Sequence, residues 1–328
     1  MKNVLKRFTR LGLVLTLTAG MALTTAQVEA GKTFNVGVCQ LVEHGALDAA
    51  NRGFVDGLAK AGFKEGVNLK IDQQNAQADQ SNLANIAHRF ISNRVDLICA
   101  IATPAAQTIA NATDEIPIVG TAITDYVVAK LAKSNENPGA NVTGTTDMNP
   151  VEEQLKMLVK FVPNMKTVGT IYSSSEVNSQ LQVDVLKKAA AKLGLQVKEA
   201  TVSTVNDIQQ AARSLVGKVE GIYIPTDNVL ASAVPTLLSI TDEEKIPVVG
   251  GEGSFVEAGC LGSLGIDYYT LGVQTGMMAA DILNGKAKPA TMAIQGQKEC
   301  AAVVNAKALK ILGLKLPEEF KNAKIVGK

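Results

Sequence analysis

Hydrophobic residues along this chain follow two alternating spacings. Short runs such as VGVCQ (36–40) and VGTIY (168–172) are apolar and rich in β-branched residues, as buried strands are. Each run leads into a segment with apolar residues at helical spacing, LDAANRGFVDGLAKAGF (47–63) or NSQLQVDVLKKAAAKLGL (178–195). Both helical segments end at a glycine followed by one more apolar residue, which is a typical helix stop. The pattern predicts strands that alternate with helices.

The same order of elements occurs twice, in residues 36–122 and 168–252. The later strands of the two copies also correspond, since RVDLICAIATPAAQ matches KVEGIYIPTDNVLA and IPIVGTA matches IPVVGGE. Strands joined by helical crossovers pair in parallel and are covered by helices on both faces. The repeat therefore predicts an α/β protein with two doubly wound parallel-sheet lobes. A duplication without a shared cleft is the alternative, but the polar loops after the strands favour a cleft.

Aligning the copies places different chemistry at equivalent strand ends. Thr103 matches Asp227, and Ala122 matches Glu252. TPAAQT offers a helix N-terminus, which favours an anion, whereas the carboxylates favour a cation. If the lobes face each other, the cleft suits a zwitterion such as an α-amino acid.

The first 30 residues predict a secretory signal peptide. Four basic residues and no acid precede an apolar stretch that is too short for a stable membrane span, and small residues lie before a cleavage site near Ala30. No later run approaches the roughly 20 apolar residues that span a bilayer. We expect an exported protein, periplasmic or otherwise outside the cytoplasm.

Charge and missing motifs exclude several classes. The chain has 32 Lys and Arg against 31 Asp and Glu, and removing four basic residues and Glu29 leaves 28 against 30. This balance argues against nucleic-acid binding. GxxxxGK[ST], HExxH, CxxC and GxSxG are all absent, and there are only two histidines. We expect no catalytic residues, metal or cofactor, with an exported α/β enzyme as the competing hypothesis.

Several longer stretches carry a family resemblance. They are HGALDAANRGFVDGLAKAGF (44–63), TPAAQT (103–108), NPGANVTGTTD (137–147), YSSSEVNS (172–179), IPTDN (224–228) and GIDYYTLGVQTGMMAADIL (265–283). Together they resemble the solute-binding proteins of ABC importers, in the branch described as tryptophan/tyrosine-type, over essentially the whole mature chain.

The resemblance implies a type I periplasmic-binding-protein fold, in which three crossovers join the lobes. The crossovers are expected near Thr145–Pro150, Gly265–Tyr268 and Lys288–Met292. The N-terminal lobe would then hold residues 31–146 and 267–291, and the C-terminal lobe residues 147–266 and 292–328.

The resemblance also implies a function. The protein would capture a small ligand, an amino acid with an aromatic or large apolar side chain first, and would deliver it as a monomer to an ABC permease and ATPase. A sensory ligand-binding subunit and a ligand of another class stay open as alternatives.

Asp227 leads the candidate site residues, because it follows a strand and a proline. It would receive the ligand's ammonium or cap the next helix, and Asp227→Asn would separate these roles because asparagine caps as well as aspartate. Glu252, between two glycines, is a second acidic candidate or a solvated loop acid. The other candidate contacts are Thr103, Ala105, Thr121, Ser174, Ser175, Asn178 and His44. Helix capping is the alternative for the serines and Asn178, and a structural or surface role for His44.

Four cysteines in an exported chain raise the question of disulfides. Cys260 and Cys300 fall beside late strands of the second copy and are the candidate pair. Cys39 and Cys99 lie inside strands that should be parallel neighbours, where disulfide geometry is poor, so buried thiols are expected.

Overall fold

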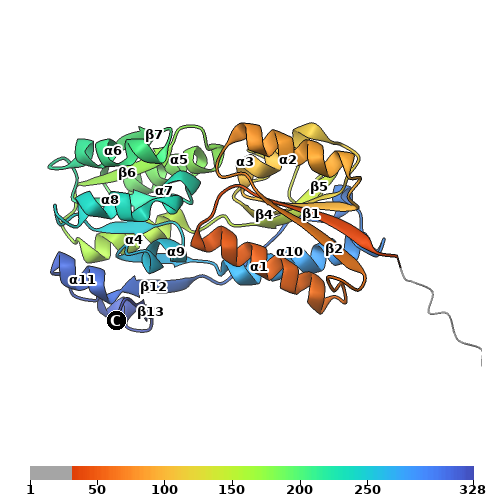
Figure 1. Cartoon of the computed structure of the whole chain (residues 1–328). Helices are drawn as coiled ribbons and strands as arrows, with labels where there is room; N and C mark the ends of the chain where they lie inside the picture. Colours follow the sequence, from red (N-terminus) through yellow and green to blue (C-terminus); the bar gives the residue numbers. More distant parts are fainter. Residues whose placement is uncertain (1–31) are drawn as a thin grey trace, which may run out of the picture. The chain divides into compact units, whose positions relative to one another are not determined.

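Residues 32–328 are described by the structure, which is a computed structural model, and the predicted signal peptide lies outside them. Their strands form two sheets (Figure 1). The sheet of the N-terminal lobe has the order β11-β5-β4-β3-β1-β2, and all its pairs are parallel. Its strands are β1 (Phe34–Gln40), β2 (Leu69–Asn75), β3 (Leu97–Ile101), β4 (Ile118–Ile123), β5 (Val142–Thr146) and β11 (Gln295–Gly296).

Helices cover both faces of this sheet. On one face α1 packs along α10, and on the other α2 packs beside α3 (Figure 1). The bounds are α1 Gly45–Lys60, α2 Gln80–Ser92, α3 Thr103–Ala112 and α10 Tyr268–Leu283. No helix within residues 32–328 is long and apolar enough to cross a membrane.

The C-terminal lobe has the sheet order β13-β12-β10-β9-β8-β6-β7, in which only β10 and β12 pair antiparallel. Its strands are β6 (Thr167–Ser173), β7 (Gln196–Val202), β8 (Gly221–Ile224), β9 (Val248–Gly250), β10 (Gly262–Gly265), β12 (Ala301–Asn305) and β13 (Lys324–Val326). Its helices are α4 (Val151–Phe161), α5 (Val177–Lys192), α6 (Ile208–Leu215), α7 (Asn228–Ser232), α8 (Val234–Thr241), α9 (Gly253–Glu257) and α11 (Ala306–Leu312).

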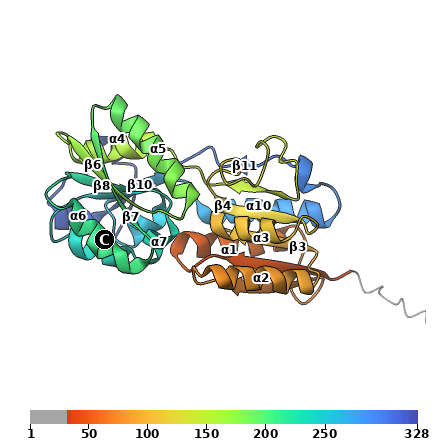
Figure 2. The ribbon, with the colours of Figure 1, turned by 90° about the horizontal axis from the view of Figure 1, so that it is seen from above.

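Strand β8 shows why this sheet needs helices on both faces. Ile222 and Ile224 join the core under α6 and α8, whereas Tyr223 between them joins the core under α4. Successive side chains of a strand point to opposite faces, so an all-apolar strand is stable only between two layers. Figure 2 shows α4 and α5 on one side of β6, β8 and β10, with α6 and α7 on the other.

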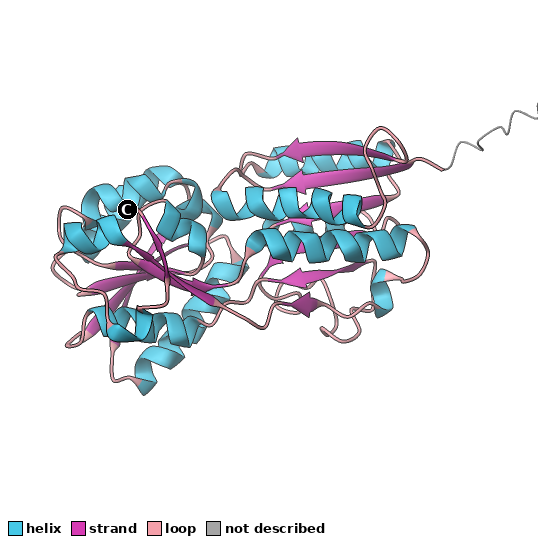
Figure 3. Ribbon diagram, turned by 90° about the horizontal axis from the view of Figure 1, so that it is seen from below, coloured by secondary structure: helices cyan, strands magenta, loops and turns pink. Residues whose placement is uncertain are grey.

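Both sheets contain the same strand order. The order β2-β1-β3-β4-β5 of the first corresponds to β7-β6-β8-β9-β10 of the second. Figure 3 shows strands between helices in each lobe. The repeat and the predicted α/β fold class of two doubly wound lobes are confirmed, with one antiparallel pair added by β12.

The chain passes between the sheets at three places. The first passage, residues 147–150, lies between β5 and α4, and the second, residues 266–267, lies between β10 and α10. The third passage occurs later than the predicted Lys288–Met292, since β11 still pairs with β5 of the first sheet. Residues 297–300 make this passage, and residues 292–296 therefore belong with the N-terminal lobe.

The predicted Cys260–Cys300 disulfide is wrong, because both residues are free thiols. They flank β10 and β12, and in this antiparallel pair Gly262 lies opposite Val304 and Gly265 opposite Ala301. Antiparallel pairing puts the two cysteines at opposite ends of the ladder, roughly 20 Å apart at 3.3 Å per residue. A disulfide needs Cα atoms within about 7 Å.

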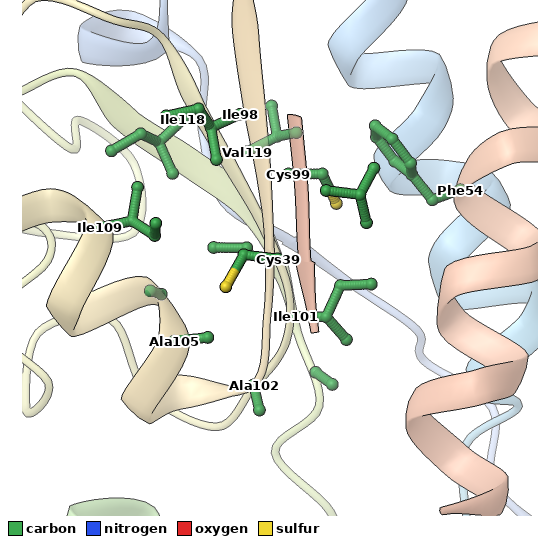
Figure 4. Close-up of a cluster of buried hydrophobic side chains, with 14 of the residues drawn as sticks. Cys39, Phe54, Ile98, Cys99, Ile101, Ala102, Ala105, Ile109, Ile118 and Val119 are labelled. Atoms are coloured by element: carbon green, nitrogen blue, oxygen red, sulfur yellow. The ribbon is translucent and has the colours of Figure 1, made fainter. Parts of the chain in front are cut away.

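Cys39 and Cys99 are buried free thiols, as the sequence predicts. Their strands β1 and β3 are parallel neighbours, in which Val38 is level with Cys99. Cys39 therefore points to the other face, toward Ala105 and Ile109, while Cys99 faces Phe54 (Figure 4). The two sulfur atoms fill separate layers of the core.

Candidate functional site

A small cavity lies where loops from both lobes meet. The space between its lining atoms, part of which is open to solvent, is about 270 Å³. Nearly all its lining residues follow the carboxyl end of a strand, where parallel sheets place their sites. They are His44, Leu47, Ala122, Thr124, Asp147, Asn178, Thr226, Asp227, Asn228, Glu252 and Tyr268.

Local backbone geometry brings these loops together. Gly251 directly follows strand β9, and a Cβ atom there would lie 2.8 Å from the backbone nitrogen of Thr226. Only glycine permits this approach, which sets Glu252 next to the loop after β8. In the other lobe, the register of β4 shifts between Gly120 and Ile123, and Ala122 has a φ of 55°. This left-handed residue turns the strand end toward the cavity.

His44 connects the two lobes across the cavity. Its Nε2 lies 3.2 Å from Oδ1 of Asn228, and its Nδ1 lies 3.9 Å from Oε1 of Glu252, beyond hydrogen-bond distance. Burial lowers the pKa of His44, although Asn228 and Asp48 oppose that shift. A second contact between the lobes joins the hydroxyls of Thr124 and Thr226 at 3.4 Å.

Asp147 begins the first passage between the lobes, and Tyr268 directly follows the second as the first residue of α10. The Tyr268 hydroxyl donates to Oδ2 of Asp147 at 2.7 Å, while Oδ1 of Asp147 has no hydrogen-bond partner. Burial raises the pKa of Asp147 above its ordinary value. The segments that join the lobes thus contribute an acid to the cavity.

Glu252 is the second acid with a free oxygen. Its Oε1 accepts from the Ser254 hydroxyl at 2.6 Å, and its Oε2 is buried without a partner. Burial raises the pKa of Glu252 to about 8, and the charge of Asp147 adds to the effect.

Both carboxylate oxygens of Asp227 accept hydrogen bonds from the protein. Its Oδ1 accepts from the backbone N–H of Leu230 at 2.9 Å, and so caps α7. Its Oδ2 accepts from the backbone N–H of Ser173 at 2.6 Å and from the Ser179 hydroxyl at 2.7 Å. The capping role weighed from the sequence is therefore present, and both oxygens are already occupied.

Four buried polar atoms at the cavity have no hydrogen-bond partner within the described part of the chain: His44 Nδ1, Asp147 Oδ1, Asn178 Oδ1 and Glu252 Oε2. Buried polar atoms are normally satisfied, and each lone one costs about 1–3 kcal/mol. Their convergence on one cavity marks it as a site that needs a polar ligand.

Of the nine predicted contacts, four line the cavity and five do not. His44, Asn178, Asp227 and Glu252 are brought together, whereas the structure places the following elsewhere: Thr103, Ala105, Thr121, Ser174 and Ser175.

The five outliers have physical reasons. Thr103 and Ala105 are buried in the first turn of α3. The Thr121 hydroxyl accepts a hydrogen bond from the Thr145 hydroxyl inside the first sheet. Ser174 and Ser175 precede the start of α5 and are exposed. The turn at the end of β4 places Ala122 and Thr124, rather than Thr121, in the cavity lining.

Sequence reasoning missed Asp147, Thr124, Leu47 and Ala122. The rule that selected Asp227 could also have selected Asp147, because Asp147 directly follows the strand end at Thr146 and lies within the first predicted crossover. The left-handed turn at Ala122, which places Thr124 in the cavity lining, has no sequence signal, since alanine rarely adopts that conformation.

Comparison with known proteins identifies the family. Residues 35–325 match the family model described as ABC transporter substrate binding protein. The chain belongs to this family of ABC transporter substrate-binding proteins. A curated relative is the tyrosine-binding protein of Clostridioides difficile (strain R20291). It is 42% identical over 288 residues, which cover 88% of this chain and 83% of the relative.

Two solved structures resemble this substrate-binding protein to different degrees. The ABC domain from Streptococcus pneumonia in complex with L-Trp is 39% identical, with a TM-score of 0.87 and coverage of 90% of this chain and 100% of that chain. The ligand-free, open structure of a substrate-binding protein with adhesive properties from Clostridium difficile is 46% identical, with a TM-score of 0.70 and coverage of 90% and 99%.

The TM-scores run opposite to the sequence identities. A rotation between lobes lowers a TM-score without changing either lobe. This chain therefore superposes more closely on the L-Trp complex than on the open structure, although the open structure is more similar in sequence. The contacts of His44 and Thr124 across the cavity agree with a closed arrangement.

Proposed function

We propose that this substrate-binding protein captures an L-α-amino acid in the cavity between its lobes, without chemical turnover. It then delivers the amino acid, outside the cytoplasm, to the permease and ATPase of an ABC importer. The observation that carries the proposal is the set of three unpartnered acceptors, Asp147 Oδ1, Asn178 Oδ1 and Glu252 Oε2. An ammonium has three N–H donors and a positive charge, so it satisfies all three acceptors and two carboxylates together.

The charge balance of the lining supports a cationic group. Four of its residues can carry a charge, of which three are acids and one is His44, while neither lysine nor arginine is among the residues that line the cavity. A ligand that brings only an anion would meet repulsion from Asp147, Asp227 and Glu252.

The ligand's carboxylate has a separate partner at the start of α1. His44 occupies the N-cap position but makes no capping hydrogen bond, so the first backbone N–H groups of this 16-residue helix have no side-chain cap. Such a helix end favours an anion. Leu47, Ala122 and Tyr268 add apolar surface for a side chain.

The relatives support an aromatic side chain. The curated relative is named a tyrosine-binding protein, and the Streptococcus structure holds L-Trp. L-tyrosine and L-tryptophan are therefore the first ligands to test.

A thermal-shift screen with calorimetric titration of the hits tests the proposal. L-tyrosine or L-tryptophan at about 100 times Kd should stabilise the protein by about 2.7 kcal/mol. The matching acids without the amino group, hydroxyphenylpropanoate and indolepropanoate, should bind far more weakly. Glu252→Gln should reduce the difference in affinity between each amino acid and its counterpart without the amino group. The matched control is Glu153→Gln, at an exposed position, which should leave that difference unchanged.

Two results would overturn the proposal. One is a stabilising sugar or nucleobase with no response to any amino acid. The other is a chemically altered product that accumulates over many turnovers when the protein is incubated with a metabolite pool and followed by mass spectrometry.

A further inference from the structure

Glu176 is a buried carboxyl that lies behind the cavity wall rather than in it. It is only 4% exposed, and its two oxygens accept hydrogen bonds from four donors of the C-terminal lobe. Two donors are side-chain amides, Asn178 Nδ2 at 3.0 Å and Asn228 Nδ2 at 2.5 Å. The others are the backbone N–H groups of Asn228 and Val229, both at 3.3 Å. Both asparagines line the cavity, so Glu176 contacts the cavity wall from behind.

This carboxylate decides which end of each amide faces the cavity. Asn178 gives its Nδ2 to Glu176 and to the Thr226 carbonyl, each at 3.0 Å, which leaves its Oδ1 without a partner at the cavity. Asn228 donates from its Nδ2 to Glu176, and its Oδ1 accepts from Nε2 of His44. A reversed amide would set its oxygen against the carboxylate and turn two N–H donors into the cavity, which is doubly unfavourable.

We propose that Glu176 is a positioning residue for the ligand's ammonium, since it holds the Asn178 and Asn228 amides with their oxygens toward the cavity. The inference rests on the proposed function and deepens it. Glu176 does not touch the ligand. It keeps the C-terminal wall an array of acceptors, which selects an amino acid over the same molecule without its amino group.

The neighbouring carboxyl of Asp227 caps α7 and does not orient the asparagine amides. Its oxygens accept from Ser173, Ser179 and Leu230 and from neither asparagine amide. Burial and the charge of Asp227 raise the pKa of Glu176, while its amide partners favour the ionised form. The amide hydrogen bonds are therefore specific to Glu176.

The test compares two ligands by calorimetric titration of the full chain. L-tyrosine and hydroxyphenylpropanoate are titrated into wild type, Glu176→Leu, and the double variant Glu176→Leu with Asn178→Asp. Both asparagine amides donate to Oε2 of Glu176 while the Val229 N–H donates to Oε1, so a glutamine could keep both amides with its own oxygen. Leucine has no acceptor, so the amides lose the contact that orients them and can turn donors into the cavity. The preference for L-tyrosine over hydroxyphenylpropanoate should fall by about 10- to 100-fold.

The double variant separates positioning from a purely structural role. In it, the introduced aspartate has an acceptor oxygen at either end of its carboxylate and presents one to the cavity, so the preference for L-tyrosine should return. A purely structural defect would weaken both ligands alike and would not respond to Asn178→Asp. An unchanged preference in Glu176→Leu, or a lost preference that the double variant does not restore, overturns the proposal.

Two further outcomes stay distinguishable. If circular dichroism shows Glu176→Leu unfolded, Asn178→Leu replaces it, because leucine has the shape of asparagine and offers no acceptor. A preference that survives Asn178→Leu overturns the proposal. If wild type itself shows no preference for an amino acid over its counterpart without the amino group, the proposed function fails together with this inference.

Discussion

At the scale of single residues, Glu252 determines how the cavity responds to pH. The groups that face it are His44 and Ser254 at close range, and Asp147 and Glu257 through their charges. Its pKa of about 8 lies above the ordinary 4.5, because burial penalises the charged form. A raised carboxyl pKa contributes stability that is fully present below the ordinary value and is lost as pH rises through the folded value.

The ligand-free protein should therefore lose stability between about pH 5 and pH 8, because the unfolded chain releases the Glu252 proton over this range while the folded protein retains it. Glu252→Gln cannot ionise, so its free energy of unfolding should fall less over this range. Denaturant unfolding of both proteins at the two pH values measures the difference. Equal pH dependence in the two proteins would show that Glu252 is not the ionising group.

Asp227 leads to a different expectation from the one drawn from its sequence position. Asparagine can keep the cap to Leu230, but its N–H₂ group would then face the Ser173 N–H and the Ser179 hydroxyl. Asp227→Asn should therefore lower the free energy of unfolding by about 1–3 kcal/mol. Ser179→Ala, which removes one donor, should cost less. A fully stable Asp227→Asn would contradict this account of the carboxylate.

At the scale of elements, the repeated order of strands and helices was enough to predict most of the fold. Runs such as those around Val36 and Val168 alternate with helices in the same order twice, and parallel sheets follow because a helical crossover returns the chain to the same edge. The short strand β11 escaped prediction, since Gln295 and Gly296 are exposed and polar and pair only through their backbone. Periodicity reports burial, and a strand without burial gives no such signal.

The site was predictable only as far as strand ends indicate it. Asp227 and Glu252 follow apolar strands and were found, but which of them has a free oxygen depends on donors far away in sequence, such as Ser173 and Ser179. The position of His44 opposite Asn228 depends on how the lobes meet. Neither property can be read from local spacing.

The antiparallel pairing of β10 with β12 gives a test at this scale. Cys260 and Cys300 lie at opposite ends of this pair, and Cys39 and Cys99 are buried in the other lobe. Thiol titration of the exported protein in denaturant, without reductant, should detect all four cysteines. Two reactive thiols in place of four would contradict the strand register.

At the scale of the whole molecule, the cavity connects lobe closure to ligand charge. His44 and Thr124 of one lobe contact Asn228 and Thr226 of the other, while Asp147 comes from a segment that joins them. Unpartnered buried acceptors oppose closure until a donor enters. An ammonium supplies that donor and favours the closed arrangement, which is how a ligand shifts a conformational equilibrium.

The most direct measurement is a crystal structure of this protein with L-tyrosine or L-tryptophan. We expect the ligand nitrogen within about 3 Å of Asp147 Oδ1, Asn178 Oδ1 and Glu252 Oε2, and its carboxylate at the start of α1. A ligand whose nitrogen lies away from these three oxygens, or whose carboxylate takes their place, would contradict the account.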